Sequence, residues 1–288
     1  MKIILRNYIG PEDLVLQHEF WVSVTHELPW CWKPTISPLF YSKSNQFDPR
    51  SRCFAFNGNH MVGYMSFTGE GEFVSLGYPW VLPGYVEELQ EKLYDAVYGF
   101  ASSPEYGGRV FAQRMRQQWT AQISFFKEHG FSIQRNDDIF ALNLSSTGSP
   151  SISSSYDIAI GHNFKWEGFC EVATTCMTAD KFNSFKIYFS SVNFDFIVKA
   201  SAQSRLVAYL GFTIRSDTGY SELIAIALQP AEEGVLGSCM AVAINELRSR
   251  NVSFLGTNVS HVEGGSQFLS QLGFEKVSEE LLLVKKLY

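Results

Sequence analysis

The chain has 288 residues, a formal net charge of −6 and a hydrophobic fraction of 45%, which suits one or two well-filled cores. Because neither half carries a basic run, we expect no nucleic-acid partner. The N-terminus turns polar too soon for a secretory signal, and no run of about 18 apolar residues predicts a membrane span.

The cysteines are scattered and odd in number, and none forms a Cys-x-x-Cys pair. This pattern predicts neither a disulfide framework nor a zinc site, so we expect no metal. It favours a reducing, cytoplasmic setting. The residues are Cys31, Cys53, Cys170, Cys176 and Cys239.

The sequence of the first half predicts strands alternating with amphipathic helices, which is typical of a mixed α/β domain. Asn57-Gly58-Asn59 lies between two apolar runs and predicts a hairpin. Gly130 is expected to stop the last helix of this half. We predict strands at Lys2–Leu5, Cys53–Phe56, Met61–Phe67, Phe73–Leu82, Arg109–Ala112 and Ile139–Leu144, and helices across residues 14–24, 86–100 and 123–129.

The segment Leu28–Phe47 is rich in aromatic residues, and its prolines forbid one long helix. Its large aromatic side chains would leave too much apolar surface in water. We therefore expect it to cover the open sheet face of the first half. It is either a loop packed on the core or an aromatic-lined pocket for an acceptor substrate.

Ser145–Ser155 is almost entirely small and polar, which predicts a linker. It would join a first domain, residues 1–144, to a second domain, residues 156–288. In the second half we predict strands at Tyr156–Ile160, Phe196–Val198, Leu206–Phe212, Leu223–Leu228, Val252–Val259 and Leu281–Lys286, and helices across residues 168–176, 181–196, 236–247 and 266–272.

The stretch Ser221–Leu247 predicts a buried strand, a glycine-containing turn and a helix with one apolar face. A helix that opens after such a turn has unpaired backbone N–H groups at its start, which suit an anion such as phosphate. The alternative is an ordinary strand–helix crossover with a flexible turn.

Four blocks of the first half recur in the second, in order and at offsets of 143 to 147 residues. Val62–Phe67 matches Val207–Phe212, and the strand-ending Pro83 matches Pro230. The helical faces that follow also agree, as do the two Gly-Phe endings at Gly130 and Gly273. The repeat predicts a duplicated α/β domain.

Two motifs of the second half resemble the GNAT superfamily of N-acetyltransferases. Leu228-Gln229-Pro230 stands for the family's V-x-P, before a glycine turn and a helix, and Gln271-Leu272-Gly273-Phe274 resembles its K-L-G-F ending. With the repeat, the resemblance implies two tandem GNAT-like domains, similar to mycothiol synthase-like proteins. Each would be a mixed, mainly antiparallel sheet flanked by helices.

In that family the turn holds the pyrophosphate of acetyl-coenzyme A, and the strand end lines its pantetheine arm. The resemblance therefore implies an acetyl-CoA site in the second half, while Glu87 and Glu88 disfavour one at the matching turn of the first half. The residues implied in cofactor binding are Ile226, Ala227, Leu228, Gly234, Val235, Leu236, Gly237, Ser238 and Cys239.

Acyl transfer needs a group that takes a proton from the attacking amine. Glu222, which opens the buried strand, is the candidate general base, although a solvated strand-end glutamate is the alternative. His261 and Glu263 are further candidates or simply loop residues. Cys239 is either a thiol activated by the helix start or a small packing residue.

The sequence thus favours an acyl-CoA-dependent N-acyltransferase that acetylates a small amine. The alternative is a catalytically inactive GNAT-fold protein that binds a ligand or a partner. Leu269 favours this alternative, because the family usually carries an acid Tyr at that place.

Overall fold

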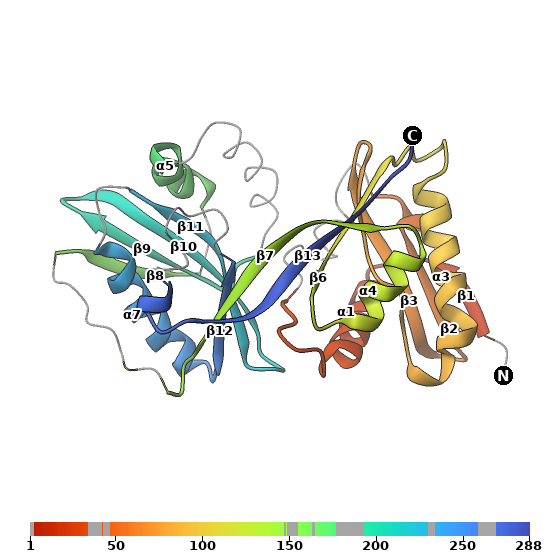
Figure 1. The fold of residues 1–288 in the computed structure, drawn as a ribbon, viewed down its shortest axis with the longest axis horizontal. Helices are drawn as coiled ribbons and strands as arrows, with labels where there is room; N and C mark the ends of the chain where they lie inside the picture. Colours follow the sequence, from red (N-terminus) through yellow and green to blue (C-terminus); the bar gives the residue numbers. More distant parts are fainter. Residues whose placement is uncertain are drawn as a thin grey trace. The chain divides into compact units, whose positions relative to one another are not determined.

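The structure is a computed structural model that describes residues 3–33, 42, 47–146, 148, 155–162, 165–176, 193–229, 234–258 and 269–288. The chain forms two compact units (Figure 1). The first unit comprises Met1–Cys31, Pro38–Asn136 and Glu279–Tyr288, and the second comprises Trp32–Ser37 and Asp137–Ser278. In each unit, helices cover a sheet.

The strand order in the first unit is β1-β2-β3-β4-β6-β13, and β5 pairs with β3. β4 and β6 are parallel, and the other neighbours are antiparallel. The elements are β1 (Ile3–Asn7), α1 (Glu12–Thr25), the 3-10 turn η1 (Pro49–Ser51), β2 (Arg52–Asn57), β3 (His60–Glu70), β4 (Phe73–Leu76), β5 (Trp80–Val81), the 3-10 turn η2 (Pro83–Tyr85), α3 (Val86–Ala101), β6 (Val110–Arg116), α4 (Thr120–Glu128) and β13 (Glu275–Lys286).

The second unit repeats this order as β8-β9-β10-β11-β12-β7, again with one parallel pair, β11 and β12. In both units a helix, α3 or α7, connects the two parallel strands. The elements are β7 (Ser132–Asn143), β8 (Asp157–Gly161), α5 (Trp166–Cys176), β9 (Phe196–Ala202), β10 (Arg205–Arg215), β11 (Tyr220–Leu228), α7 (Val235–Ser249) and β12 (Phe254–Asn258).

The local predictions that rest on periodicity are confirmed. Leu89, Leu93 and Val97 of α3 are buried, as are Met240, Ile244 and Leu247 of α7. The hairpin between β2 and β3 makes its turn at Gly58, whose φ is 63°. Gly130 and Gly273, which follow helices, also have a positive φ. The expected helix across residues 181–196 and most of the aromatic segment lie outside the described residues.

The described ends of that aromatic segment show where it joins the structure. Phe47 packs edge-on against Tyr8, with ring centroids 5.0 Å apart. At the other end, the carbonyl of Trp30 accepts a hydrogen bond of 3.1 Å from Arg116. Trp30 carries a positive φ of 55°. Whether the segment covers the sheet stays a prediction.

The prediction of one continuous strand in the first unit is wrong. Phe73–Leu82 was expected as a single strand, but residues 77–79 separate β4 from β5. The N–H of Gly77 donates to the carbonyl of Ser66 (2.8 Å), and a Cβ on Gly77 would lie 2.5 Å from that oxygen. Pro79 follows and cannot donate into a ladder, so regular pairing stops.

The last strands of the two halves are exchanged, which the sequence analysis did not anticipate. We expected residues 139–144 to close the first half and 281–286 to close the second. Instead Ile139–Asn143 of β7 pair with β12, and Glu280–Lys286 of β13 pair with β6. Neighbours in sequence usually pair, and the repeat makes both strands fit either sheet by pattern. The units are therefore discontinuous in sequence.

Glu280 ties the exchanged strand to the first unit. Its carboxylate accepts from Arg114 at 3.0 Å and from Arg116 at 3.2 Å. Arg116 is among the most deeply buried residues of the chain, and Leu283 of the same strand is fully buried. The predicted class, a mixed and mainly antiparallel sheet flanked by helices, is confirmed. The proposed domain limits at 144 and 156 stay a prediction, because most of the linker lies outside the described residues.

Candidate functional site

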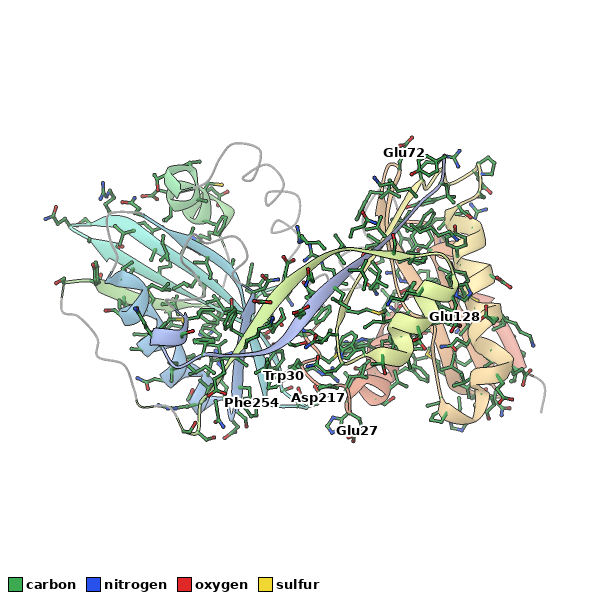
Figure 2. All side chains as sticks on the ribbon, in the orientation of Figure 1. Glu27, Trp30, Glu72, Glu128, Asp217 and Phe254 are labelled. Carbon is green, nitrogen blue, oxygen red and sulfur yellow. The ribbon has the colours of Figure 1, made fainter. Side chains whose placement is uncertain are left out.

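The candidate site lies where β11 leads into α7 in the second unit. Before β11, the guanidinium of Arg215 pairs with Asp217 at 2.9 Å and holds the turn that starts the strand (Figure 2). β11 ends at Leu228, and α7 begins at Val235 with Gly234 as its N-cap. Residues 230–233 lie outside the described residues. The strand and the helix predicted for this stretch are confirmed, whereas most of the predicted turn lies outside the described residues.

β11 and β12 pair only over a short stretch and then separate. Their parallel register runs from Tyr220 with Phe254, which Figure 2 labels, to Leu223 with Thr257. Beyond that, β11 stays paired with β10 as far as Leu228. Among the described residues, the β12-facing edge of β11 has no strand partner after Leu223. Backbone groups on such an edge are available to a ligand.

A β-bulge marks the point of separation. Gly211 of β10 faces Ala225, but the next residue, Phe212, faces Leu223, so Ile224 is the extra residue on β11. Bulges bend a strand and increase its local twist. The bulge also sets Ile224 and Ala225 against the same core cluster, that of Phe169 on α5. β11 thus turns away from β12 because of a specific irregularity in its pairing with β10.

The strand-end residues predicted to line the cofactor divide between the two faces of the sheet. Ile226 and Leu228 are partly buried against the cluster formed with α7, whereas Ala227 is buried against α5. Ala227 can therefore contact a ligand only through its backbone N–H and carbonyl groups. This agrees with the kind of contact expected of a strand edge, in which N–H and carbonyl groups do the binding.

The start of α7 combines open space with the backbone N–H groups of a first helical turn. A Cβ on Gly237 would meet no atom of the described residues within 4 Å, and one on Gly234 would come no closer than 3.7 Å, to the Tyr156 hydroxyl. No described side chain caps the helix. The N–H groups of its first turn have no partner within a helix, so this end attracts anions.

The other predicted residues of this turn face inward. Val235, Ser238 and Cys239 are buried, and Leu236 is partly buried. Burial raises the pKa of the Cys239 thiol to about 12. Burial thus disfavours the hypothesis of an activated thiol, because desolvation makes the thiolate harder to form. Cys239 is a packing residue, and of this group Gly234, Leu236 and Gly237 have exposed surface.

The candidate base Glu222 is half-buried, two residues into β11, and not simply solvated. Its Oε1 accepts a hydrogen bond of 2.9 Å from the hydroxyl of Tyr220. Its register partner on β12 is Gly256. Sequence reasoning missed Tyr220, although residues two apart on a strand share a face. His261 and Glu263 lie outside the described residues, so their proximity to the site is untested.

The matching position of the first unit is built differently. The 3-10 turn Pro83–Tyr85 leads directly into α3, and the phenol of Tyr85 accepts from the amide of Asn57 at 2.8 Å. The first turn of α3 carries Glu87 and Glu88. Gly84 is as open as Gly237. Space is therefore present in both units, but among the described residues the first turn of α3 carries two carboxylates and that of α7 carries none.

No group of three or more His, Cys, Asp or Glu residues that could hold a metal ion occurs in the part of the chain that the structure describes. In the same part, no helix is both long and apolar enough to cross a membrane.

Both units contain a sheet with one parallel pair whose strands are connected by a helix, and in the second unit a bulged strand separates from its parallel neighbour. This arrangement is that of the GNAT fold. Comparison with solved structures confirms the resemblance to tandem GNAT proteins at the level of the fold. No protein-family model matches the sequence, and no curated protein matches it.

Three solved structures illustrate the likeness. A tandem GNAT protein from the clavulanic acid biosynthesis pathway, without acetyl-CoA, is 14% identical with a TM-score of 0.69, covering 99% of this chain and 98% of that one. N-myristoyltransferase of Saccharomyces cerevisiae, with bound myristoyl-CoA, is 10% identical with a TM-score of 0.62 over 98% and 78%. A GCN5-related N-acetyltransferase from Sphaerobacter thermophilus is 13% identical with a TM-score of 0.57 over 99% and 95%.

Proposed function

We propose that the protein is an acyl-CoA-dependent N-acyltransferase that transfers an acetyl group from acetyl-CoA to a small amine. The second unit binds the cofactor, and the first unit shapes or supports the acceptor side without binding a second cofactor. Cys53 and Cys239 form no disulfide, which suits the proposed cytoplasmic setting.

The separation of β11 from β12 is the observation that carries this proposal. A pantetheine arm contains two amide groups and needs an extended partner with unpaired backbone donors and acceptors. The edge of β11 from Ile224 to Leu228 offers these groups next to the start of α7. The arm runs beside Ile226, Ala227 and Leu228, in the manner of an added strand.

The pyrophosphate binds at the first turn of α7. Gly234 and Gly237 let it approach the backbone closely, and the N–H groups of Val235 and Leu236 donate to it. Ser238 and Cys239, whose side chains are buried, support this turn by packing beneath it. The helix dipole adds a favourable interaction with the negative charge.

The chemistry follows from one base beside the thioester. The amine nitrogen attacks the acetyl carbonyl, Glu222 takes a proton from that nitrogen, and the carbon–sulfur bond breaks. The coenzyme leaves as a thiolate that gains a proton to become the thiol. Glu222 lies one residue before the last paired position of β11 and β12, which is Leu223 with Thr257. It is thus close to the point from which the pantetheine arm would emerge.

Calorimetric titration with acetyl-CoA tests the binding half of the proposal, and we expect one site per chain. A thiol-release assay across a panel of small amines, with acetyl-CoA at saturation, tests catalysis. Two sites per chain would contradict the assignment to the second unit. If acetyl-CoA binds but no thiol is released with any amine, the proposed transferase activity is contradicted.

The second candidate function is an inactive acyl-CoA-binding protein. Leu269, at the place where a proton donor would be expected, is buried with 4% of its surface exposed, and it packs in the α7 core. It therefore cannot protonate the leaving thiolate. The titration and the thiol-release assay separate the two candidates, since only the transferase releases free thiol with an amine present.

A further inference from the structure

Tyr220 is the first residue of β11 and lies deeply buried, with 4% of its surface exposed. Its hydroxyl donates to Oε1 of Glu222 at 2.9 Å. A hydrogen bond between residues two apart on one strand joins side chains of the same face. It restricts the glutamate to a rotamer that keeps this contact, whereas a half-buried glutamate with no such contact would sample several.

Gly256 on β12 makes this arrangement sterically possible. A Cβ built there would lie 2.0 Å from the Tyr220 hydroxyl and 2.7 Å from the ring carbon that bears it. Any other residue at 256 would push the phenol off its present position. Gly256 is also the register partner of Glu222. The phenol thus lies over the strand pair at the level of the carboxylate.

The pair sits one step before the strands separate. The next register position joins Leu223 to Thr257, and the Thr257 hydroxyl donates to the carbonyl of Leu223 at 3.1 Å. This contact, which is buried, closes the ladder. The backbone under Glu222 is therefore held on both sides: by β10 through Thr213 and by β12 through Gly256. Only the glutamate side chain needs a further constraint to be fixed.

We propose that Tyr220 is a positioning residue for Glu222, and that Gly256 is the glycine required for it. This inference rests on the proposed function, in which Glu222 is the base. The donated hydrogen bond holds the base in one orientation toward the acceptor nitrogen. Tyr220 acts through Glu222 and does not itself exchange a proton with the substrate.

The test is a double-mutant cycle on thiol release, using the full chain and the best amine of the panel. We expect Tyr220→Phe to lower kcat about tenfold, the effect of losing one hydrogen bond to a charged group, and to leave KM for acetyl-CoA unchanged. In the Glu222→Gln background, Tyr220→Phe should cause no further loss, because the residue it positions is no longer a base.

Two further variants guard against a merely structural effect. Gly256→Ala should reproduce the kcat loss of Tyr220→Phe, and the two changes together should cost no more than either. Tyr209→Phe is the matched control: Tyr209 is also a buried sheet tyrosine, but its hydroxyl accepts from the backbone N–H of Lys165 at 3.0 Å. It should leave kcat unchanged. Circular dichroism verifies that each variant is folded.

The outcomes separate this inference from the function on which it rests. A wild-type chain that releases no thiol with any amine overturns both. If the wild type is active but Tyr220→Phe leaves kcat unchanged, the positioning role alone is overturned. The same holds if Tyr220→Phe lowers kcat by the same factor in the wild type and in the Glu222→Gln variant. An effect of Tyr209→Phe as large as that of Tyr220→Phe also overturns it.

Discussion

The two units share a strand order yet differ at the one position where a cofactor would bind. In the second unit, β11 is continuous to Leu228 and reaches an uncapped helix with open glycines. In the first unit, the matching strand is broken at residues 77–79, and the helix begins with Glu87 and Glu88. In the proposed function, these few residues decide which unit binds the anionic cofactor.

The largest expected effect concerns β13, the exchanged strand that pairs with β6 and completes the sheet of the first unit. Deleting residues 279–288 should destabilise the first unit far more than the second. The deletion removes a strand from β6, exposes the core around Leu283 and takes Glu280 from the buried Arg116. Breaking a buried ion pair alone costs about 3–5 kcal/mol, a large part of a typical stability of about 5–15 kcal/mol.

Two buried thiols, one in each unit, allow this to be measured. Cys53 lies on β2 of the first unit and Cys239 on α7 of the second, and both are buried. A thiol reagent reaches each only when its own unit opens. The deletion should speed the labelling of Cys53 and change that of Cys239 much less, while Glu280→Gln should give a smaller effect in the same direction. Equal acceleration at both thiols would contradict the assignment of β13 to the first unit.

The next effect in size is catalytic and belongs to the second unit alone. Glu222→Gln should lower kcat by about 10²–10⁴-fold, the usual contribution of a general base, with acetyl-CoA affinity preserved. Glu88→Gln, a change at an exposed glutamate of the first unit, is the control and should leave kcat unchanged. Steady-state thiol release gives both constants. A Glu222→Gln variant with wild-type kcat would transfer the role of base to another residue.

A matched pair of glycine variants compares the two turns directly. Gly237→Val should weaken acetyl-CoA binding by at least about tenfold, because a branched side chain would occupy the space over the α7 backbone that the pyrophosphate needs. Gly84→Val fills the equivalent open space in the first unit and should leave affinity unchanged. Since neither Cβ meets a described atom within 4 Å, both variants should fold. Calorimetry that shows equal loss from both would contradict a single site.

Neutralising the acidic turn asks whether charge alone separates the units. Glu87→Gln with Glu88→Gln should remove carboxylates that stabilise the start of α3 by roughly 0.3–1 kcal/mol each. We expect a slightly lower melting temperature and still one acetyl-CoA per chain, because the matching strand remains broken after Leu76. A second binding site in the titration of this variant would show that the carboxylates alone exclude the cofactor.

How much the sequence can predict depends on the range of the interaction. The helical faces of α3 and α7, the hairpin at Gly58 and the end of the strand before Pro83 follow from local periodicity and turn chemistry, and they are confirmed. The bulge at Ile224 and the fit of Tyr220 over Gly256 depend on pairing between strands. One sequence carries no local signal for either.

The exchange of β7 and β13 lies further still beyond sequence reasoning. Both strands have 12 residues, follow a helix and a Gly-Phe ending, and carry a continuous apolar run, Ile139–Leu142 in β7 and Leu281–Val284 in β13. An internal repeat therefore predicts two equivalent last strands without saying which sheet each completes. What distinguishes them is a small number of long-range partners, such as Glu280 with Arg114 and Arg116.

The smallest expected effect concerns Cys239, the one residue of the predicted turn whose chemistry the structure reassigns. Burial raises its pKa from 9.0 to about 12. Below pH 9 the thiol is protonated in both the folded and the unfolded chain and contributes no pH dependence. Between about pH 9 and 12 only the unfolded chain ionises, which favours unfolding. The wild type should therefore lose about 1 kcal/mol more stability between pH 8 and pH 10 than Cys239→Ser does. Denaturant unfolding at the two pH values measures this difference, and Cys53→Ser, whose thiol has a pKa raised by burial to about 11, should behave alike in the first unit. If Cys239 were instead an activated thiol, its labelling at pH 7 would be fast and would not depend on the opening of α7.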